Sequence, residues 1–490
     1  MTSSSLDPSP TPLHLPADEF ERLGGDLLRW ITHHLDTAEH RPVTAPVAPG
    51  EIYRGFPASP PETGESLERL PAELDQLVVP GITGWQNPNW FAYFPCNHSY
   101  PSVLGELLSA GLGVQGMLWN TSPACTELES LVMDWSLEAF GLPDRFRTMP
   151  RDPDGPPCEG GGVIQDTASS ATFCALLAAR ERATDGAAGR DGIASCPTLV
   201  AYTSEHAHSS IEKACTMSGI GRANLRLVPS DPETFALDTD ALAALMKEDA
   251  DAGRVPFFVC STCGSTSSGA IDPTARIVEI AREHGAWVHL DGAMFGVAAI
   301  CPEWRWVLEG AAECDSICVN PHKWMFTNFD CDLFWVADRR ALTRAMGIMP
   351  EYLRNAPSES GEVIDYRDWQ VPLGRRFRAL KLWLVYRHYG LEGIRTAFRD
   401  HVAMAQEFAD MIDADPDWVR VAPSPLSLVC IRHQDGDERT KSTLEAINAS
   451  GEAMLSHTKL HDEYVIRVSI GQSRTNIEHV HALFERLGSA

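Results

Sequence analysis

The sequence predicts an α/β protein in which a mostly parallel β-sheet is covered by helices on both faces. Between residues 158 and 338, short apolar runs alternate with segments of helical periodicity, an order typical of parallel strands joined by helices. The 490 residues, 44% of them hydrophobic, are enough for a large core and more than one packed unit. Ligands of such sheets bind beyond the carboxyl ends of the strands, so functional side chains are expected directly after the apolar runs.

Residues 1–99 are expected to form an N-terminal helical arm. Residues 18–35 carry apolar side chains at helical spacing, and a proline-rich connector covers residues 41–61. Such an amphipathic helix needs a partner surface, either on its own chain or on a second subunit of a dimer. The first 13 residues have neither the basic start nor the apolar run of an export signal.

Residues 100–380 are expected to form the large α/β domain and residues 381–490 a smaller α+β domain. Strands of the large domain are predicted over residues 198–202, 256–260, 286–290, 316–319 and 331–336. Helices are predicted over residues 171–182, 239–247 and 273–283, the last with Asp272 as its N-cap and Pro273 at its first position. The smaller domain is predicted to contain helices over residues 398–412 and 476–487 and strands near 426–432 and 464–469.

Composition excludes several classes of function. With 40 basic and 67 acidic side chains, the formal charge of −27 would repel nucleic acids and anionic membrane surfaces. The 13 cysteines are odd in number and widely spread, which favours a reduced, cytoplasmic compartment. Cys260 and Cys263 have no second pair at metal spacing, so buried thiols are favoured over a metal site. The uncharged residues 107–126 include Gln115, Asn120 and Pro123, which favours a pocket wall or buried core over a membrane span.

One lysine and one aspartate indicate the chemistry. Lys323 is one of only six lysines and closely follows the apolar run 316–319, where partial desolvation would make its amine a nucleophile toward an aldehyde. Asp291 ends the preceding apolar run, and a buried acid needs a cationic partner. The ring nitrogen of pyridoxal phosphate (PLP) is such a partner. The alternatives are that Asp291 caps a helix or pairs with an arginine.

Two further segments fit a phosphorylated, ring-shaped cofactor. Gly160, Gly161 and Gly162 precede a short apolar run, and small side chains at residues 167–169 then open a helical segment, a pattern suited to binding phosphate. His208 follows the run 198–202 and is placed either to stack on a cofactor ring or to serve a structural role.

These residues lie in motifs that resemble those of the PLP-dependent group II decarboxylases, above all the aromatic-L-amino-acid decarboxylases. The motifs are G-G-G-V-I-Q-D-T-A-S-S-A, H-A-H-S-S, H-L-D-G-A, N-P-H-K-W, F-D-C-D, D-Y-R-D-W-Q-V-P-L-G-R-R-F-R-A-L-K, R-P-V-T, F-A-Y-F-P, S-P-A-C-T-E-L-E and R-V-S-I-G-Q-S. The resemblance covers nearly the whole chain. It implies the fold-type I architecture with a sheet of the seven-stranded type, and an obligate homodimer with the active site at the interface and the N-terminal segment wrapped on the partner.

The resemblance also implies roles for individual residues. Lys323 would bind PLP covalently, Asp291 would pair with the pyridine nitrogen, and His208 would stack on the ring. The catalytic set would be Lys323, Tyr352, His208 and Asp291, with Tyr352 in a mobile loop as the proton donor to the substrate carbon. The cofactor would be held by Thr167, Ala168, Ser169, His208, Thr266, Asp291, Ala293, His322 and Lys323. The substrate would be bound by Trp85, Tyr93, Phe94, Pro95, Cys96, Gln115, Met117 and Gly374.

The reaction implied is decarboxylation of an aromatic L-amino acid, namely tryptophan, 5-hydroxytryptophan, phenylalanine, tyrosine or DOPA, to the amine and CO₂. The alternatives are an aromatic aldehyde synthase, whose loop usually has phenylalanine where this chain has Tyr352, and a histidine decarboxylase. The alternative that is not an enzyme is a catalytically silent dimer that binds PLP only as a structural ligand. Glutamate or cysteine-sulfinate decarboxylation would need a cation that the aromatic wall at residues 85–94 does not offer.

Several departures from the family pattern leave the substrate open. Asp291 is followed by Gly-Ala-Met rather than by Ala-Ala and an aromatic residue, and the usual histidine is missing from the segment Trp85-Gln86-Asn87-Pro88. Gln115 and Met117 stand where apolar and aromatic residues are common, and Cys96 where threonine is common. Gly374 matches a position of the family where glycine leaves room for a large ring and serine often accompanies imidazole substrates, so the resemblance favours tryptophan over histidine.

Overall fold

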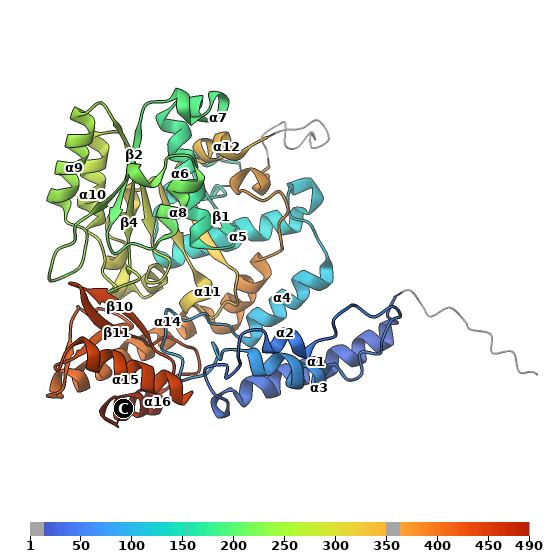
Figure 1. Ribbon diagram of the computed structural model, residues 1–490. Helices are drawn as coiled ribbons and strands as arrows, with labels where there is room; N and C mark the ends of the chain where they lie inside the picture. The colour runs from blue at the N-terminus through green and yellow to red at the C-terminus, as the bar shows by residue number, and fades with distance from the viewer. Residues whose placement is uncertain (1–13, 153, 349–362, 490) are drawn as a thin grey trace, which may run out of the picture.

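The computed structural model describes residues 14–152, 154–348 and 363–489. The N-terminal helices α1 (Ala17–Asp36), α2 (Glu51–Gly55) and α3 (Leu70–Glu73) project sideways from the main body (Figure 1). Several apolar side chains of this arm are exposed, among them Phe20 at 65% and Leu28 at 41%. The expected amphipathic helix is therefore present, and part of its apolar face is left without a partner in the single chain.

The core of the main body is a seven-stranded sheet with the strand order β1-β7-β6-β5-β4-β2-β3. The strands are β1 (Gly161–Gln165), β2 (Leu199–Ser204), β3 (Leu225–Val228), β4 (Val255–Thr262), β5 (Trp287–Asp291), β6 (Ser316–Val319) and β7 (Asp332–Val336). Only β7 runs opposite to its neighbours, pairing antiparallel with β1 and β6. The predicted mostly parallel sheet is confirmed, and six carboxyl ends share one edge.

Helices cover both faces of this sheet, as predicted. One face packs on α6 (Ala168–Ala183), α8 (Ser210–Met217) and α12 (Arg339–Met346). The other packs on α5 (Pro123–Phe140), α9 (Thr239–Asp251), α10 (Thr274–Glu283) and the first part of α14 (Ala379–Ala414). Three further helices, α4 (Tyr100–Leu112), α7 (Ala187–Asp191) and α11 (Pro321–Trp324), lie at the periphery or at strand ends.

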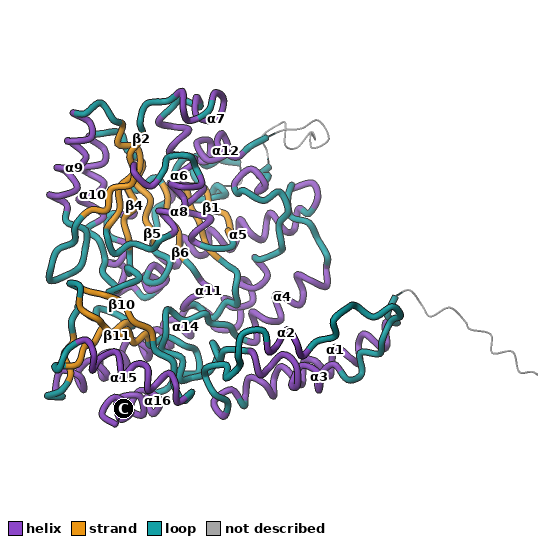
Figure 2. Tube along the Cα trace, in the orientation of Figure 1, coloured by secondary structure: helices purple, strands orange, loops and turns teal. Residues whose placement is uncertain are grey.

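A second sheet forms the C-terminal part of the molecule (Figure 2). Its strands are β8 (Trp418–Arg420), β9 (Leu428–His433), β10 (Ser456–Leu460) and β11 (Glu463–Ser469), all antiparallel and in the order β10-β11-β9-β8. They share a core with α15 (Asp437–Ser450), α16 (Ile477–Ser489) and the end of α14. Because α14 packs on both sheets, it joins the two parts, and the predicted boundaries at residues 99 and 380 stay predictions.

The predicted capping role of Asp272 is wrong. The N-cap of α10 is Pro273, and no side chain caps this helix. The buried carboxylate of Asp272 instead accepts hydrogen bonds from the backbone N–H groups of Thr262, at 2.7 Å, and Leu237, at 2.8 Å. The carboxylate of Asp272 thus has two backbone donors from distant segments instead of a helix end. Burial raises the pKa of Asp272 to about 6.

Within the described part of the chain, no helix combines the length and the apolar character needed to span a membrane.

Candidate active site

The carboxyl ends of β1, β2, β4, β5 and β6 surround a cavity of about 180 Å³. It is lined by Phe94, Thr167, Ala168, Ser169, His208, Thr262, Gly264, Thr266, Asp291, Ala293, Asn320, His322 and Lys323. All nine residues that the resemblance assigns to the cofactor are in this set. They converge because each lies at, or within four residues of, the carboxyl end of a strand, and the parallel strands bring these ends to the same edge.

Lys323 and Asp291 are the charged pair of this cavity. Lys323 lies on α11, immediately after β6, and its Nζ is 5.3 Å from the ring centroid of Phe94. Burial lowers the pKa of Lys323, and the nearby Asp291 opposes this effect. A lowered pKa raises the fraction of free amine, which is the nucleophilic form.

Asp291 ends β5 and is only 7% exposed. Its Oδ1 accepts a hydrogen bond of 3.0 Å from the backbone N–H of Ala293. It does not cap a helix, and no arginine or lysine of the described residues forms an ion pair with it. The cavity therefore presents a buried carboxylate that a bound cationic group would stabilise.

The N-terminus of α6 also borders the cavity. Thr167 is the N-cap in an extended conformation, and its side chain makes no capping hydrogen bond. Its backbone N–H donates to Asp166 Oδ1 at 2.7 Å. The following N–H groups open a 16-residue helix, where unpaired donors and the helix dipole favour an anion.

Two histidines border the cavity in their neutral form. His208 Nδ1 accepts a hydrogen bond of 3.1 Å from the N–H of Ser210, and burial lowers the pKa of His208. His322 Nδ1 accepts from the N–H of Cys331 at 3.0 Å, and burial, reinforced by Lys323, lowers the pKa of His322 to about 3. Because Nδ1 is the acceptor in both rings, the proton of each neutral ring is on Nε2.

The residues expected to bind the substrate separate into two groups. Phe94 lines the cavity, whereas Trp85 belongs to an aromatic cluster outside the lining, 5.8 Å from Tyr93 and 4.2 Å from Trp90 between ring centroids. Pro95 and Cys96 continue this segment, and the carbonyl of Cys96 accepts from Gln86 Nε2 at 2.6 Å.

The second group lies elsewhere in the chain. Gln115 Oε1 accepts a hydrogen bond of 3.0 Å from the N–H of Arg375, and the carbonyl of Met117 accepts from Arg367 at 3.1 Å. A Cβ added to Gly374 would meet Gln115 Nε2 at 3.4 Å. These three residues thus form one cluster that does not line the cavity of their own chain. Tyr352 lies outside the described residues.

Arg467 is a site residue that the sequence argument missed. It is 3% exposed, and its Cζ lies 5.0 Å from the ring centroid of Phe94. The guanidinium donates to the carbonyl of Tyr93 at 3.1 Å and to Ser456 Oγ at 3.0 Å, but its Nη2 has no partner among the described residues. Burial lowers the pKa of Arg467. Its place in the R-V-S-I-G-Q-S motif was the only signal in the sequence.

Comparison with known proteins identifies the family. The family described as "Pyridoxal-dependent decarboxylase conserved domain" matches residues 49–434. Phenylacetaldehyde synthase from Arabidopsis thaliana is 40% identical over 95% of this chain and 94% of its own length. The chain belongs to the pyridoxal-dependent decarboxylase family.

Two further relatives agree with this assignment. Tryptophan decarboxylase 2 of Oryza sativa subsp. japonica is 39% identical over 96% of this chain and 94% of its own length. The crystal structure of Oryza sativa TDC with PLP and tryptamine superimposes with a TM-score of 0.93 at 38% identity, covering 98% of this chain and 99% of that one. The protein is therefore a PLP-dependent carboxy-lyase of fold-type I.

The cavity of this decarboxylase fits PLP. Thr262 Oγ1 and Asn320 Oδ1 are buried polar atoms in its lining without a hydrogen-bond partner in the described structure. Buried polar atoms are rarely left unpaired, and the polar edge of a bound cofactor would supply partners. Together with the amine of Lys323, the carboxylate of Asp291 and the helix N-terminus, they match the aldehyde, the ring nitrogen and the phosphate of PLP.

Proposed function

We propose that this enzyme decarboxylates an aromatic L-amino acid, giving the corresponding amine and CO₂. The candidates are tryptophan, 5-hydroxytryptophan, phenylalanine, tyrosine and DOPA. The observation that carries the proposal is the aromatic ring beside the reactive amine, because the ring centroid of Phe94 lies 5.3 Å from Lys323 Nζ. Relatives named as tryptophan and tyrosine decarboxylases support this substrate class.

The residues of the cavity have distinct roles in this proposal. Bound PLP supplies an aldehyde that captures the substrate amine and a ring that accepts the electron pair of the broken bond. Lys323 holds the cofactor, and the first N–H groups of α6 hold its phosphate. The carboxylate of Asp291 keeps the ring nitrogen protonated, which stabilises the charge that develops during bond breaking. His208 Nε2–H and Tyr352 are the candidate proton donors to the substrate carbon.

Arg467 is the candidate partner of the substrate carboxylate. Its guanidinium lies against the ring of Phe94. Among the described residues it forms no ion pair with an acid, and its Nη2 has no hydrogen-bond partner. A cation at this position would orient the carboxylate for bond breaking. It would also select amino acids over simple amines.

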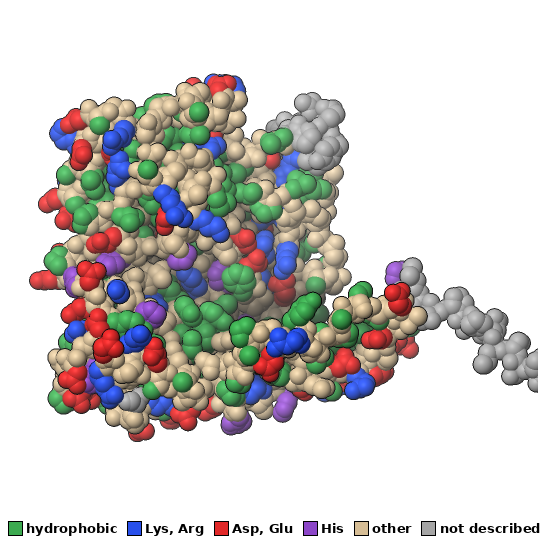
Figure 3. Space-filling view, viewed as in Figure 1, with side chains coloured by type: hydrophobic (Ala, Val, Ile, Leu, Met, Phe, Trp, Pro, Cys, Tyr) green, Lys and Arg blue, Asp and Glu red, His purple; other side chains and the backbone are tan. Residues whose placement is uncertain are grey.

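We propose further that the enzyme acts as a homodimer with the active site at the interface. Leucines of α4 are exposed although they are large and apolar, namely Leu104, Leu107, Leu108 and Leu112, at 46–58%. Hydrophobic side chains also gather where the projecting helices meet the main body (Figure 3). In a dimer that covers α4, the Gln115, Met117 and Gly374 cluster would face the partner's cavity rather than its own.

One panel of substrates tests the reaction. The PLP-loaded enzyme is incubated with each aromatic amino acid and with histidine, and CO₂, amine, ammonia and peroxide are measured. Amine in equal amount to CO₂ is expected, while Lys323→Ala is expected to give neither. Peroxide and ammonia in place of the amine would establish the aldehyde synthase reaction instead, and no product from any aromatic amino acid would reject the proposal.

A further inference from the structure

We infer that Lys381 is a positioning residue for Lys323: its buried ammonium holds the segment 328–331, which in turn orients the end of the cavity where Lys323 lies. The inference rests on the proposed role of Lys323 in holding PLP. Lys381 lies on α14, 58 positions along the chain from Lys323 and outside the cavity lining. It therefore acts through other residues.

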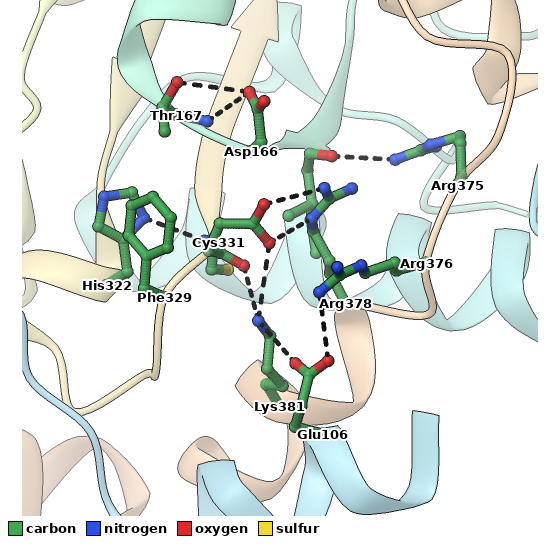
Figure 4. Close-up of polar contacts among 12 residues, drawn as sticks. Glu106, Asp166, Thr167, His322, Phe329, Cys331, Arg375, Arg376, Arg378 and Lys381 are labelled. Atoms are coloured by element: carbon green, nitrogen blue, oxygen red, sulfur yellow. Dashed lines mark hydrogen bonds and ion pairs between the residues drawn. The ribbon is translucent and has the colours of Figure 1, made fainter. Parts of the chain in front are cut away.

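The surroundings of Lys381 are unusual for a lysine. Its side chain is 0% exposed, and all three ammonium protons have acceptors (Figure 4). Nζ donates to the carbonyl of Asp330 at 2.7 Å and to the carbonyl of Asn328 at 3.2 Å, and it forms an ion pair of 3.0 Å with Glu106 of α4. Two of its three N–H groups thus donate hydrogen bonds to backbone carbonyls of a single short segment, residues 328–331.

A second cation holds the same segment. Asp330 accepts two hydrogen bonds from Arg378, at 2.8 and 3.1 Å, and its Oδ1 lies 3.9 Å from Lys381 Nζ. Burial opposes ionisation of Asp330, but Arg378 and Lys381 together hold its pKa below the usual value. Both the backbone and the side chain of Asp330 are therefore fixed by α14.

The held segment contacts His322, the neighbour of Lys323. The N–H of Cys331 donates to His322 Nδ1 at 3.0 Å, and the ring of Phe329 packs edge-on against the His322 ring at 4.8 Å between centroids (Figure 4). His322 and Lys323 are consecutive residues of the one-turn helix α11 and both line the cavity. Displacement of residues 328–331 would thus rotate His322 and move Lys323 with it.

A buried charge at this place calls for an explanation, because taking an ammonium out of water carries a large desolvation penalty even when the group is paired. The contact between α4 and α14 is close: a Cβ added to Gly105 would lie 2.7 Å from Lys381 Cα. An apolar side chain would fill the space around α4 at lower cost. Only a small group with three donors satisfies Glu106 and both carbonyls at once, and what it contributes is a defined position of the segment.

The test compares Lys381→Met with wild type in the full-length enzyme. PLP affinity is measured by titrating the apoenzyme, and the circular dichroism and visible absorption of bound PLP report its orientation and its link to Lys323. Misplacement of Lys323 is expected to weaken PLP binding about tenfold or more and to lower kcat on the order of 10- to 100-fold, with KM changed less than kcat. Lys441→Met, at an exposed helical position, is the matched control and is expected to match wild type.

A purely structural role predicts a different pattern. If Lys381→Met lowers Tm but binds PLP with wild-type affinity and wild-type dichroism, the inference is overturned. Asp330→Asn and Glu106→Gln keep size and hydrogen bonding while removing one charge each, and they decide the question if Lys381→Met does not fold. They are expected to weaken PLP binding by a smaller factor, and unchanged binding in both would also overturn the inference. Failure of Lys323→Ala to alter the visible absorption would instead contradict the proposed function.

Discussion

The cofactor cavity and the substrate wall of this decarboxylase are built in different ways. Nine cavity residues named from the motifs come from the ends of strands in one sheet, and all nine converge. The wall residues come from the segment 85–96 and from the cluster of Gln115, Met117 and Gly374, and of these only Phe94 lines the same cavity. The edge of the large sheet thus orders the cofactor residues within one chain, whereas the substrate wall comes from segments outside that sheet, one of which hydrogen-bonds to the C-terminal sheet.

Lys323 and Lys381 show the same contrast on a smaller scale. Lys381 has all three ammonium protons satisfied and pairs with Glu106 at 3.0 Å. Lys323 instead lines a cavity, and burial lowers its pKa. A lysine whose ammonium is held by acceptors on every side can position its neighbours, whereas one facing a cavity has an amine that can react.

If the reaction takes place in this cavity, removing the charge of Asp291 is expected to lower activity more than any other substitution that keeps the size of the side chain. Asp291→Asn keeps the size of the side chain but loses the charge opposite the ring nitrogen, so kcat is expected to fall on the order of 10²- to 10³-fold. Steady-state kinetics on the preferred amino acid measure this, with Trp85→Phe as the control in the wall. A loss no larger than that of the control would contradict the role of Asp291.

A change in the second group of wall residues is expected to alter specificity rather than chemistry. In Gly374→Ser the new side chain approaches Gln115 Nε2, which a Cβ alone would already meet at 3.4 Å. The ratio of kcat/KM for tryptophan over histidine is expected to drop about tenfold, the usual scale for small changes in pocket volume. PLP affinity should stay at the wild-type value, and an unchanged ratio would exclude Gly374 from the substrate pocket.

The last prediction concerns stability rather than activity, at a buried histidine behind the cavity. His401 Nδ1 accepts a hydrogen bond of 2.9 Å from Trp324 Nε1, and burial lowers the pKa of His401 to about 4. Since an unfolded histidine has a pKa of about 6.5, the unfolded chain binds the proton more readily, and stability is lost as pH falls from about 6.5 toward 4. At pH 5 this titration is expected to lower the free energy of unfolding by about 2 kcal/mol relative to neutral pH.

His401→Gln removes this titration while leaving an acceptor for Trp324. The difference in unfolding free energy between pH 7 and pH 5 should therefore be smaller in the variant than in wild type. Urea denaturation of the PLP-loaded enzyme at both pH values measures it. Equal pH dependence in the two proteins would show that His401 does not contribute.

Site residues that lie just after a strand could be predicted from the sequence, whereas those that depend on contacts between distant segments could not. The strands that precede His208, Asp291 and Lys323 were recognised from their apolar runs, although β2 and β4 extend beyond the predicted ends. Asp272 was misassigned because a local capping pattern was visible while its actual donors, 10 and 35 residues away, were not. β3, β8 and β10 were not predicted, since most of their side chains are not buried and none of the three forms an apolar run.

By itself, the sequence determined the fold class, the cofactor and the residues at the edge of the sheet, because periodicity and chain direction place the residue after each parallel strand at that edge. Only the tertiary structure brought Arg467 of β11 against Phe94, and Lys381 and Glu106 against the segment that follows Lys323. Those contacts join segments 50 to more than 370 residues apart. No local pattern encodes them, because the packing of whole helices and sheets decides which side chains meet.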